Sequence, residues 1–307
     1  MGKNTKIEWT DATWNPIRGC SRVSEGCRNC YAESVAARFS DLGQPYHGLA
    51  EFKIIGKDTP NERTEAHWTG EVAFVPEHLD DPLRWKKPAK IFVNSMSDLF
   101  HEKVQDEWIE KIMQVILACP EHIFQVLTKR PERMGNWVRN WKVGGVKFIP
   151  PPNLWLGVSV EDQKTADERI PLLLEIPAAV RWVSYEPALG PVNFQNWVPR
   201  GIDWIVMGGE SGKNARPMHP KWARDVRDLC KLVSTPFWFK QWGEWFPRTD
   251  AVDISRRHCV WKDDVATFPN NWSVCRLHLN SGNYMERIGK KLAGSLLDGD
   301  AHREFPE

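Results

Sequence analysis

Three cysteines lie close together near the start of the chain. Cys20, Cys27 and Cys30 follow the spacing C-x6-C-x2-C, and Gly19 and Gly26 give this segment backbone freedom. Three thiolates on one short loop can converge on a single metal centre, and thiolates favour zinc or iron–sulfur. Clustered cysteines in a reducing compartment are more often metal ligands or catalytic groups than disulfides. The segment therefore predicts a metal site with these three cysteines as ligands.

The number of thiol ligands decides which metal centre is expected. A structural zinc site is usually closed by a fourth Cys or His, and a [4Fe–4S] cluster normally takes four Cys ligands. With three, one iron keeps an open position, and in radical enzymes that iron binds S-adenosylmethionine. The pattern thus favours a [4Fe–4S] cluster, S-adenosylmethionine as second cofactor, and an external electron donor. Zinc stays open as the alternative if a fourth ligand folds back, and the candidates are His47, His67, Cys259 and Cys275.

The composition is that of an ordinary globular protein. A chain of 307 residues with 41% hydrophobic and 26% charged residues can bury a core without disulfides. A net charge of +1 gives no global argument for nucleic acid. The sequence has no apolar run of about 18 residues and no secretory h-region, so we expect a cytoplasmic protein and no membrane contact. Cys119 and Cys230 are expected to be core thiols, and most of the 17 tryptophans are expected to be core anchors.

Short β-rich runs alternate with helical patterns along the chain. Apolar residues recur at helical spacing over 104–119 and 222–233, and less cleanly over 162–176, where Pro171 interrupts the pattern. A strand near Asn15–Arg18 is expected to lead into the cysteine loop. The other expected strands are Val72–Val75, Ile91–Asn94, Ile123–Leu127, Leu154–Val160, Val180–Tyr185, Ile202–Met207 and Phe237–Lys240.

This alternation predicts an α/β fold with a parallel sheet. Seven or eight units fit a complete or partial TIM-like (β/α) barrel, which we place at residues 1–248. Residues 249–307 read as an irregular C-terminal appendage, least regular from Asp250 to Ser281, followed by a tail helix around Met285–Leu297.

Each predicted strand ends in polar residues, and barrels build their active sites from such ends. A lysine there can pair with a cofactor or substrate carboxylate, and a glutamate can hold ribose hydroxyls or an ammonium group. The expected catalytic groups are Lys129, Glu186, Glu210 and Lys240. The expected cofactor-binding residues are Asn94, Ser95, Ser97, Ser159, Glu161, Ser184, Gly208, Gly209 and Gln241. We expect them around one cavity that faces the cysteine loop. Without a cofactor, a lysine should pair with Glu186 or Glu210, and the alternative role is a salt-bridge network that closes the barrel.

The sequence resembles the phage-associated three-Cys-motif family, whose members are radical-SAM-like. Trp14-Asn15-Pro16 before the cysteines and Tyr31-Ala32-Glu33 after them carry the resemblance, which covers nearly the whole chain. Further blocks that carry it are Ile91–Phe100, Gln125–Pro131, Trp155–Glu161, Gly208–Gly212, Lys240–Gly243, Gly289–Lys291 and Leu297–Gly299. The resemblance implies a barrel of the radical SAM type and a separate partner protein, but no particular reaction.

Two features depart from the usual radical SAM pattern. The first cysteine gap is six residues rather than three, and Gly208-Gly209-Glu210 follows a late strand rather than the second one. The basic segment 129–148, with Trp137 and Trp141, could bind phosphates and stack bases, but a solvated helix with both tryptophans turned inward is favoured. The sequence therefore predicts a radical S-adenosylmethionine-type iron–sulfur enzyme, with nucleic-acid or nucleotide modification as the substrate class that the phage link suggests. The alternative is a zinc- or iron–sulfur-stabilised module that binds nucleic acid or protein without radical chemistry.

Overall fold

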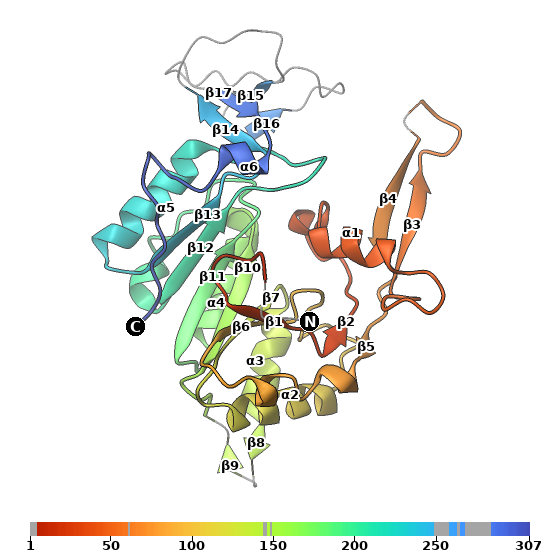
Figure 1. Cartoon of the computed structure of the whole chain (residues 1–307). Coiled ribbons are helices and arrows are strands. Elements are labelled where there is room, and N and C mark those ends of the chain that lie inside the picture. The colour runs from red at the N-terminus through yellow and green to blue at the C-terminus, as the bar shows by residue number, and fades with distance from the viewer. Residues whose placement is uncertain are drawn as a thin grey trace. The chain divides into compact units, whose positions relative to one another are not determined.

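A seven-stranded sheet runs through the chain (Figure 1). The computed structural model describes residues 5–60, 62–143, 146–147, 149–248, 258–262, 265–267 and 284–307. The strand order is β1-β6-β7-β10-β11-β12-β13, and the strand pairs whose register is described are parallel. The seven strands are β1 (Ala12–Trp14), β6 (Lys90–Val93), β7 (Ile123–Thr128), β10 (Leu154–Val160), β11 (Val180–Tyr185), β12 (Trp204–Gly208) and β13 (Phe237–Gln241).

The spatial order of these strands is their order in the sequence. In a doubly wound sheet the strand order reverses partway, whereas in a β/α barrel each strand lies beside the strand that precedes it in the sequence. Among the described strands the order begins at β1 and ends at β13, which gives seven members and no closing eighth. The predicted α/β class is confirmed, with the strand order of a partial barrel.

Helices follow most strands of this sheet. The helix expected over 104–119 is α2, the helix expected over 222–233 is α5, and the helical stretch of 162–176 continues through Pro171 as α4. A fourth helix, α3, follows β7. The bounds of the four helices are α2 (Asp106–Ala118), α3 (Pro131–Asn140), α4 (Gln163–Leu174) and α5 (Pro220–Leu232). Each connects two parallel strands, as the alternating pattern predicts.

Two expected strands differ from the prediction. Only the second half of the strand expected at Asn15–Arg18 forms a strand, β2 (Ile17–Arg18). Pro16 has no N–H for a ladder bond, and β1 of the main sheet ends at Trp14, before the expected range. The run at Val72–Val75 contains β5 (Ala73–Phe74), which pairs antiparallel with β2 outside the main sheet. β10 and β11 have the predicted bounds, and the other four predicted strands shift by at most two residues.

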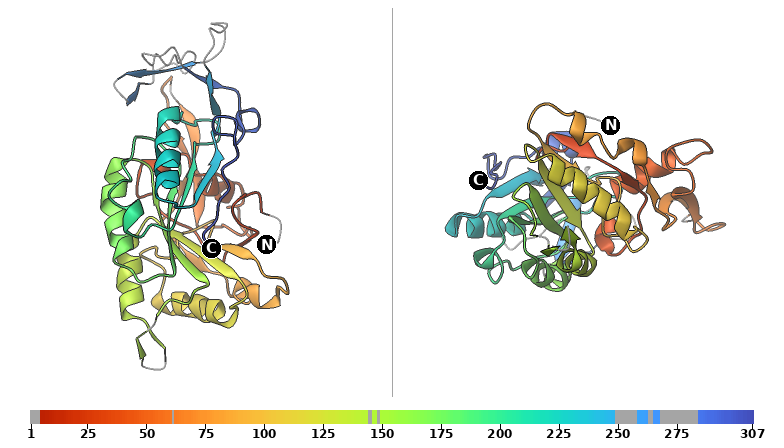
Figure 2. Two further views of the ribbon diagram at one scale, coloured as in Figure 1. Left: turned by 90° about the vertical axis from the view of Figure 1, so that its left-hand side faces the viewer. Right: turned by 90° about the horizontal axis from the view of Figure 1, so that it is seen from below.

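The chain forms two compact units, of which the first comprises residues 1–159 and 169–182. In its core Trp9 packs edge-on against Phe92 and Trp182, with ring centroids 4.8 Å and 5.2 Å away. Helix α1 and the hairpin formed by β3 and β4 lie side by side in all views (Figures 1 and 2). The remaining elements of this unit are η1 (Glu25–Cys27), α1 (Tyr31–Arg38), β3 (Ala50–Ile55), β4 (Arg63–Trp68), η2 (Pro76–His78), η3 (Pro82–Arg84), β8 (Lys142–Val143) and β9 (Val146–Lys147).

The second unit comprises residues 160–168 and 183–307. It contains an antiparallel sheet in the order β14-β17-β15-β16. The C-terminal segment lies along β13, where the N–H of Phe239 donates to the carbonyl of His302 at 2.9 Å. The elements after β11, apart from β12, β13 and α5, are η4 (Val198–Arg200), β14 (Trp245–Arg248), β15 (His258–Lys262), β16 (Val265–Thr267), β17 (Tyr284–Arg287) and α6 (Lys290–Ala293).

The prediction of a tail helix around Met285–Leu297 is wrong. Residues 284–287 form β17, and only Lys290–Ala293 are helical. Gly289 and Gly294 have φ angles of 89° and 68°, which end the helix on both sides. Most of the stretch from Asp250 to Ser281, expected to be irregular, lies outside the described residues.

Burial agrees with several sequence predictions. Cys119 and Cys230 are buried, as predicted for core thiols. Trp137 and Trp141 are also turned inward and lie 4.7 Å apart between ring centroids. None of the described helices combines the length and the apolar character needed to cross a membrane.

Candidate functional site

The three cysteines lie on one loop of the first unit, each at a defined point of the backbone. Cys20 follows Gly19, which bridges to Ser97, while Cys27 ends η1 and Cys30 caps the start of α1. Gly19 has a φ of +90°, and a Cβ at this position would lie 2.2 Å from the carbonyl oxygen of Glu71. Only glycine fits there, so the backbone conformation just before Cys20 is fixed.

The thiol of Cys20 lies in a field set by its neighbours. Burial, and next the charge of Asp98, raise the pKa of Cys20 to about 12, and the thiols of Cys30 and Cys27 add to the rise. The guanidinium of Arg130 opposes it. The three thiols lie within an eleven-residue segment of one loop. Deprotonated together they require positive charge nearby, which a bound metal provides.

Cys30 has a different environment at the helix N-terminus. Burial raises the pKa of its thiol, while the backbone N–H groups of Glu33 and Ala32 act in the opposite direction. N–H groups at a helix N-terminus stabilise an anion. The position of Cys30 before α1 thus favours the thiolate form, against the effect of burial.

The donor chemistry fits a thiolate-bound metal centre. Cys20, Cys27 and Cys30 are free and half-buried, in contrast to the fully buried Cys119 and Cys230. Within the part of the chain that the structure describes, no three His, Cys, Asp or Glu side chains are already close enough to hold a metal ion.

Two of the four candidate fourth ligands for zinc have side chains that the structure describes. His47 Nδ1 is 3.2 Å from the carbonyl oxygen of Ser40, and His67 Nε2 is 3.6 Å from the carboxylate of Glu65. Cys275 and the side chain of Cys259 lie outside the described residues. A fourth thiol from those two positions therefore stays a prediction.

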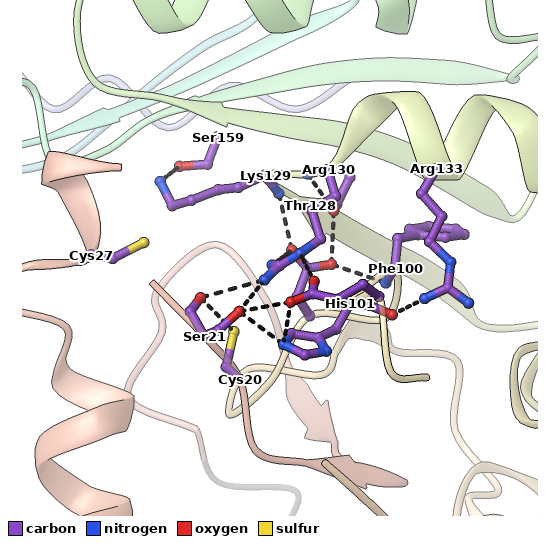
Figure 3. Close-up of polar contacts among 12 residues, drawn as sticks. Cys20, Ser21, Cys27, Phe100, His101, Thr128, Lys129, Arg130, Arg133 and Ser159 are labelled. Atoms are coloured by element: carbon purple, nitrogen blue, oxygen red, sulfur yellow. Dashed lines mark hydrogen bonds and ion pairs between the residues drawn. The ribbon is translucent and has the colours of Figure 1, made fainter. Parts of the chain in front are cut away.

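A buried ion pair lies beside Cys20 (Figure 3). Arg130 Nη1 is 3.0 Å from Asp98 Oδ2, and Arg130 Nη2 donates to the hydroxyl of Ser21 at 2.7 Å. Asp98 also accepts from the hydroxyl of Thr128 at 2.7 Å and from the backbone N–H of Lys129 at 3.1 Å. Asp98 follows β6 and Thr128 ends β7, so this network ties two strand ends to the residue that follows Cys20.

His101 also belongs to this network (Figure 3). Its side chain is fully buried, and its Nδ1 accepts from the backbone N–H of Lys103 at 3.2 Å. The neutral imidazole therefore carries its proton on Nε2 and donates to the hydroxyl of Ser21 at 2.9 Å. Ser21 in turn donates to Glu102 at 3.2 Å. Burial, and then the charge of Arg130, lower the pKa of His101, which favours this neutral form.

Sequence reasoning did not assign a role to Ser21, Asp98, His101 or Arg130. Asp98 and Arg130 lie in polar strand-end segments, so their position after a strand was a usable signal. The two residues are 32 positions apart in the sequence, so their spacing did not predict that they form a pair.

Two predicted site residues meet in the first unit. Lys129 Nζ donates to the hydroxyl of Ser159 at 2.7 Å, and Figure 3 shows the lysine side chain directed toward that serine. Ser159 is buried, and its carbonyl accepts from Arg169 Nη1 at 2.7 Å. An ammonium beside a hydroxyl at adjacent strand ends suits a carboxylate ligand.

Three other predicted residues of this unit support the cysteine loop itself. The hydroxyl of Ser95 donates to Asn15 Oδ1 at 3.1 Å, and the hydroxyl of Ser97 donates to the carbonyl of Ile17 at 2.9 Å. Asn94 Oδ1 accepts from the backbone N–H of Ile17 at 3.4 Å. These contacts hold the segment before Cys20 against the end of β6.

The second unit holds the other predicted residues. Lys240 Nζ is 2.7 Å from Glu186 Oε1, which is the pairing expected in the absence of a cofactor. Glu210 is paired with Arg216 at 2.7 Å and accepts its backbone N–H at 2.8 Å. The carboxylate of Glu210 thus forms a buried ion pair. This contact is of the kind expected for the alternative role, a salt-bridge network.

Close packing surrounds Gly208 and Gly209. A Cβ on Gly209 would lie 2.0 Å from the carbonyl oxygen of Trp242, and one on Gly208 would lie 3.2 Å from Glu186 Oε1. Gln241 Nε2 donates to the carbonyl of Gly209 at 3.3 Å. Both glycines therefore let two strand ends approach closely.

Glu161 and Ser184 also lie in the second unit and are buried. The N–H of Glu161 donates to the hydroxyl of Thr165 at 2.9 Å, at the start of α4. One cavity shared by these groups and the cysteine loop stays a prediction.

The basic segment 129–148 uses most of its charges internally. Arg130 pairs with Asp98, Arg133 with Asp106 at 3.0 Å, and Arg139 donates to Asn136 at 2.8 Å. Together with the two buried tryptophans, these contacts support the inward-turned helix rather than a nucleic-acid surface.

Comparison with known proteins gives a family but no activity. Among solved structures, two mutants of spore photoproduct lyase are similar to this chain. One has a TM-score of 0.43 at 9% identity, with 94% of this chain and 72% of the other covered. The second has a TM-score of 0.36 at 9% identity, with 89% and 67% covered. None of the curated proteins matches this chain. A family model described as "Protein of unknown function (DUF5131)" matches residues 4–306, so the chain belongs to the DUF5131 family.

Proposed function

We propose that this chain is an iron–sulfur enzyme that uses S-adenosylmethionine, with Cys20, Cys27 and Cys30 as cluster ligands. The observation that carries the proposal is the set of three half-buried thiols on one loop. Three protein ligands leave one iron of a [4Fe–4S] cluster without a protein ligand. When bound, such a cluster supplies an electron from an external donor to S-adenosylmethionine, which begins radical chemistry.

The residues around Cys20 hold its thiolate in place. Ser21 is fixed by hydrogen bonds from Arg130 and His101, and Arg130 is fixed in turn by Asp98. The guanidinium also offsets the negative charge that accumulates on three thiolates. In this proposal Arg130 positions the loop and moderates its charge.

Lys129 and Ser159 are the groups we assign to the carboxylate of S-adenosylmethionine. Lys129 supplies a positive charge and Ser159 a hydroxyl donor, and they are already 2.7 Å apart. A charged hydrogen bond of this kind is stronger than a neutral one. Glu186 and Lys240 remain proposed for ribose or ammonium contacts. The remaining cofactor-binding candidates are proposed as support for these groups.

The substrate and partner are proposed only from resemblance. The likeness to the phage-associated three-Cys-motif family suggests nucleic-acid or nucleotide modification and a separate partner protein. The basic segment 129–148 does not strengthen the nucleic-acid idea, because Arg130, Arg133 and Arg139 make internal contacts.

Anaerobic purification of the full chain tests the proposal. We expect a brown protein with about four iron and four sulfide ions per chain, as a [4Fe–4S] cluster requires. Addition of dithionite and S-adenosylmethionine should yield 5′-deoxyadenosine and methionine. A colourless protein with one zinc ion per chain would contradict the proposal and favour a structural metal site. A cluster-loaded protein that releases no 5′-deoxyadenosine would contradict the radical chemistry but keep the metal assignment.

A further inference from the structure

One ion pair joins the two ends of the cysteine loop. Arg22 lies between Cys20 and Cys27, and Glu33 lies three residues after Cys30. Arg22 Nε is 3.0 Å from both carboxylate oxygens of Glu33, and Arg22 Nη2 is 2.6 Å from Oε2. The side chain of Glu33 is 2% exposed, so this two-pronged contact is shielded from water.

The same two side chains also hold strand β4. Glu33 Oε1 accepts the backbone N–H of Trp68 at 2.7 Å, and Arg22 Nη2 donates to the carbonyl of Ala66 at 3.0 Å. Helix α1, which carries Glu33, packs against the hairpin through a small apolar core (Figure 1). The core consists of Ala32, Ala36, Ala37, Tyr46, Leu49, Ala50 and Met96, with Cys30, Val35, Ala66, Trp68 and Ala73 against it.

This arrangement makes the loop and the hairpin depend on each other. A shift of the loop away from β4 would separate Arg22 from Glu33 and leave a buried carboxylate without its cation, which is strongly unfavourable. A shift of β4 would remove the N–H of Trp68 and the carbonyl of Ala66 from the same two groups. Neither segment can move alone without breaking contacts made by the other.

We propose that Arg22 and Glu33 form a clasp that couples metal loading of the three cysteines to the ordering of the β3–β4 hairpin. The clasp rests on the cysteine site of the proposed function, but it requires only that the three thiolates bind one metal centre. Arg22 and Glu33 are positioning residues in this scheme. Loading of the loop stabilises the hairpin, and by reciprocity an ordered hairpin favours loading.

Backbone hydrogen exchange of the full wild-type chain tests the coupling. The chain is compared before and after reconstitution with ferrous iron and sulfide, and metal is measured on the same samples. We expect exchange in β3 and β4 to slow by at least about fivefold on loading, the lower range of common site–site coupling. A parallel sample loaded with Zn²⁺ gives the same comparison if the chain prefers zinc.

Matched variants separate the clasp from general stability. Glu33→Gln keeps an acceptor for the Trp68 N–H but removes the negative charge, and Arg22→Lys keeps the charge but loses the fork of donors. Both should abolish the loading-dependent slowing of exchange. Glu286→Gln is the control, because Glu286 is 3% exposed and pairs with a partly exposed Arg248 at 3.0 Å in the second unit. It should leave the slowing intact at a similar cost in stability.

The outcomes are distinguishable. A chain that binds Zn²⁺ but no iron and sulfide overturns the proposed function, while the clasp is still decided by the zinc comparison. Full metal content with unchanged exchange in β3 and β4 overturns the clasp alone. A chain that binds neither metal overturns both. Because the wild-type comparison needs no substitution, a variant that fails to fold cannot obscure the result.

Discussion

Arg130 donates a hydrogen bond of 2.7 Å to the hydroxyl of Ser21, the residue next to Cys20. The same guanidinium lies 3.0 Å from Asp98, and both side chains are close to fully buried. This contact places a fixed positive charge beside a predicted metal ligand.

Replacing Arg130 should change the reduction potential of the cluster. A nearby cation stabilises the more negative reduced state, so Arg130→Gln should lower the midpoint potential in an anaerobic redox titration. Loss of one partner of a buried pair should also reduce the free energy of unfolding by about 3 kcal/mol. Arg130→Lys keeps the charge and should recover most of the potential. Equal potentials in all three proteins would show that Arg130 does not act on the metal centre.

Gly19→Ala should displace the loop that carries Cys20. The added Cβ would meet the carbonyl oxygen of Glu71 at 2.2 Å, and the left-handed backbone adds roughly 1–2 kcal/mol of strain for a residue with a Cβ. We expect a large loss of bound iron, measured per chain after anaerobic purification. Gly48→Ala is the matched control, since Gly48 also has a positive φ of 76° but faces open space. It should retain iron and lose about 1 kcal/mol of stability.

The cysteines should divide into two classes on substitution. Cys20→Ala, Cys27→Ala and Cys30→Ala should each remove most of the metal, because the remaining two thiols cannot hold a cluster. Cys119→Ala and Cys230→Ala should keep full metal and lose roughly 1–2 kcal/mol from the core. Iron analysis and urea unfolding check the two classes. An equal requirement for Cys259 or Cys275 would mean four protein ligands and would remove the open iron.

Lys129→Met should weaken binding of S-adenosylmethionine to the cluster-loaded chain. Losing a hydrogen bond to a charged group costs about 1.5–3 kcal/mol, or an increase in Kd of about tenfold or more. Calorimetric titration with S-adenosylmethionine measures this directly. Lys142→Met, at an exposed position in the same unit, should leave the Kd unchanged. A Kd that does not respond to Lys129→Met would remove this lysine from the site.

Asp298 should make the second unit sensitive to acid. Hydrogen bonds from Arg224, and also from Arg227, lower the pKa of Asp298 from 3.8 to about 2. A lowered pKa in the folded state stabilises the protein above the unfolded value of 3.8, and this stability is lost as the pH falls toward 2.

Because the side chain is 36% exposed, water screens the pair, and we expect Asp298→Asn to cost only about 1 kcal/mol at pH 7. The difference from wild type should shrink between pH 4 and pH 2 in urea unfolding. Asp225→Asn, at an exposed ion pair on α5, should cost a few tenths of a kcal/mol. A constant difference at all pH values would contradict the assignment.

The sequence by itself determined the elements whose signal is local. The bounds of β10 and β11 followed from predominantly apolar runs, because a strand buried on both faces is rich in apolar side chains. The helical spacing of α2 and α5 identified their buried faces in the same way. The cysteine spacing identified candidate ligands, because three donors on one short loop need no partner from elsewhere in the chain.

Tertiary structure alone decided which polar groups meet. Lys129 and Ser159 were both candidates, but only the pairing of β7 with β10 brings them to 2.7 Å. The Asp98–Arg130 pair and the contacts of Arg22 and Glu33 with β4 join residues from different elements. The residue type determines which interactions a side chain can form, whereas its actual partner depends on how strands and helices pack. For that reason the sequence could name candidate ligands, whereas the contacts around them became visible only in the folded chain.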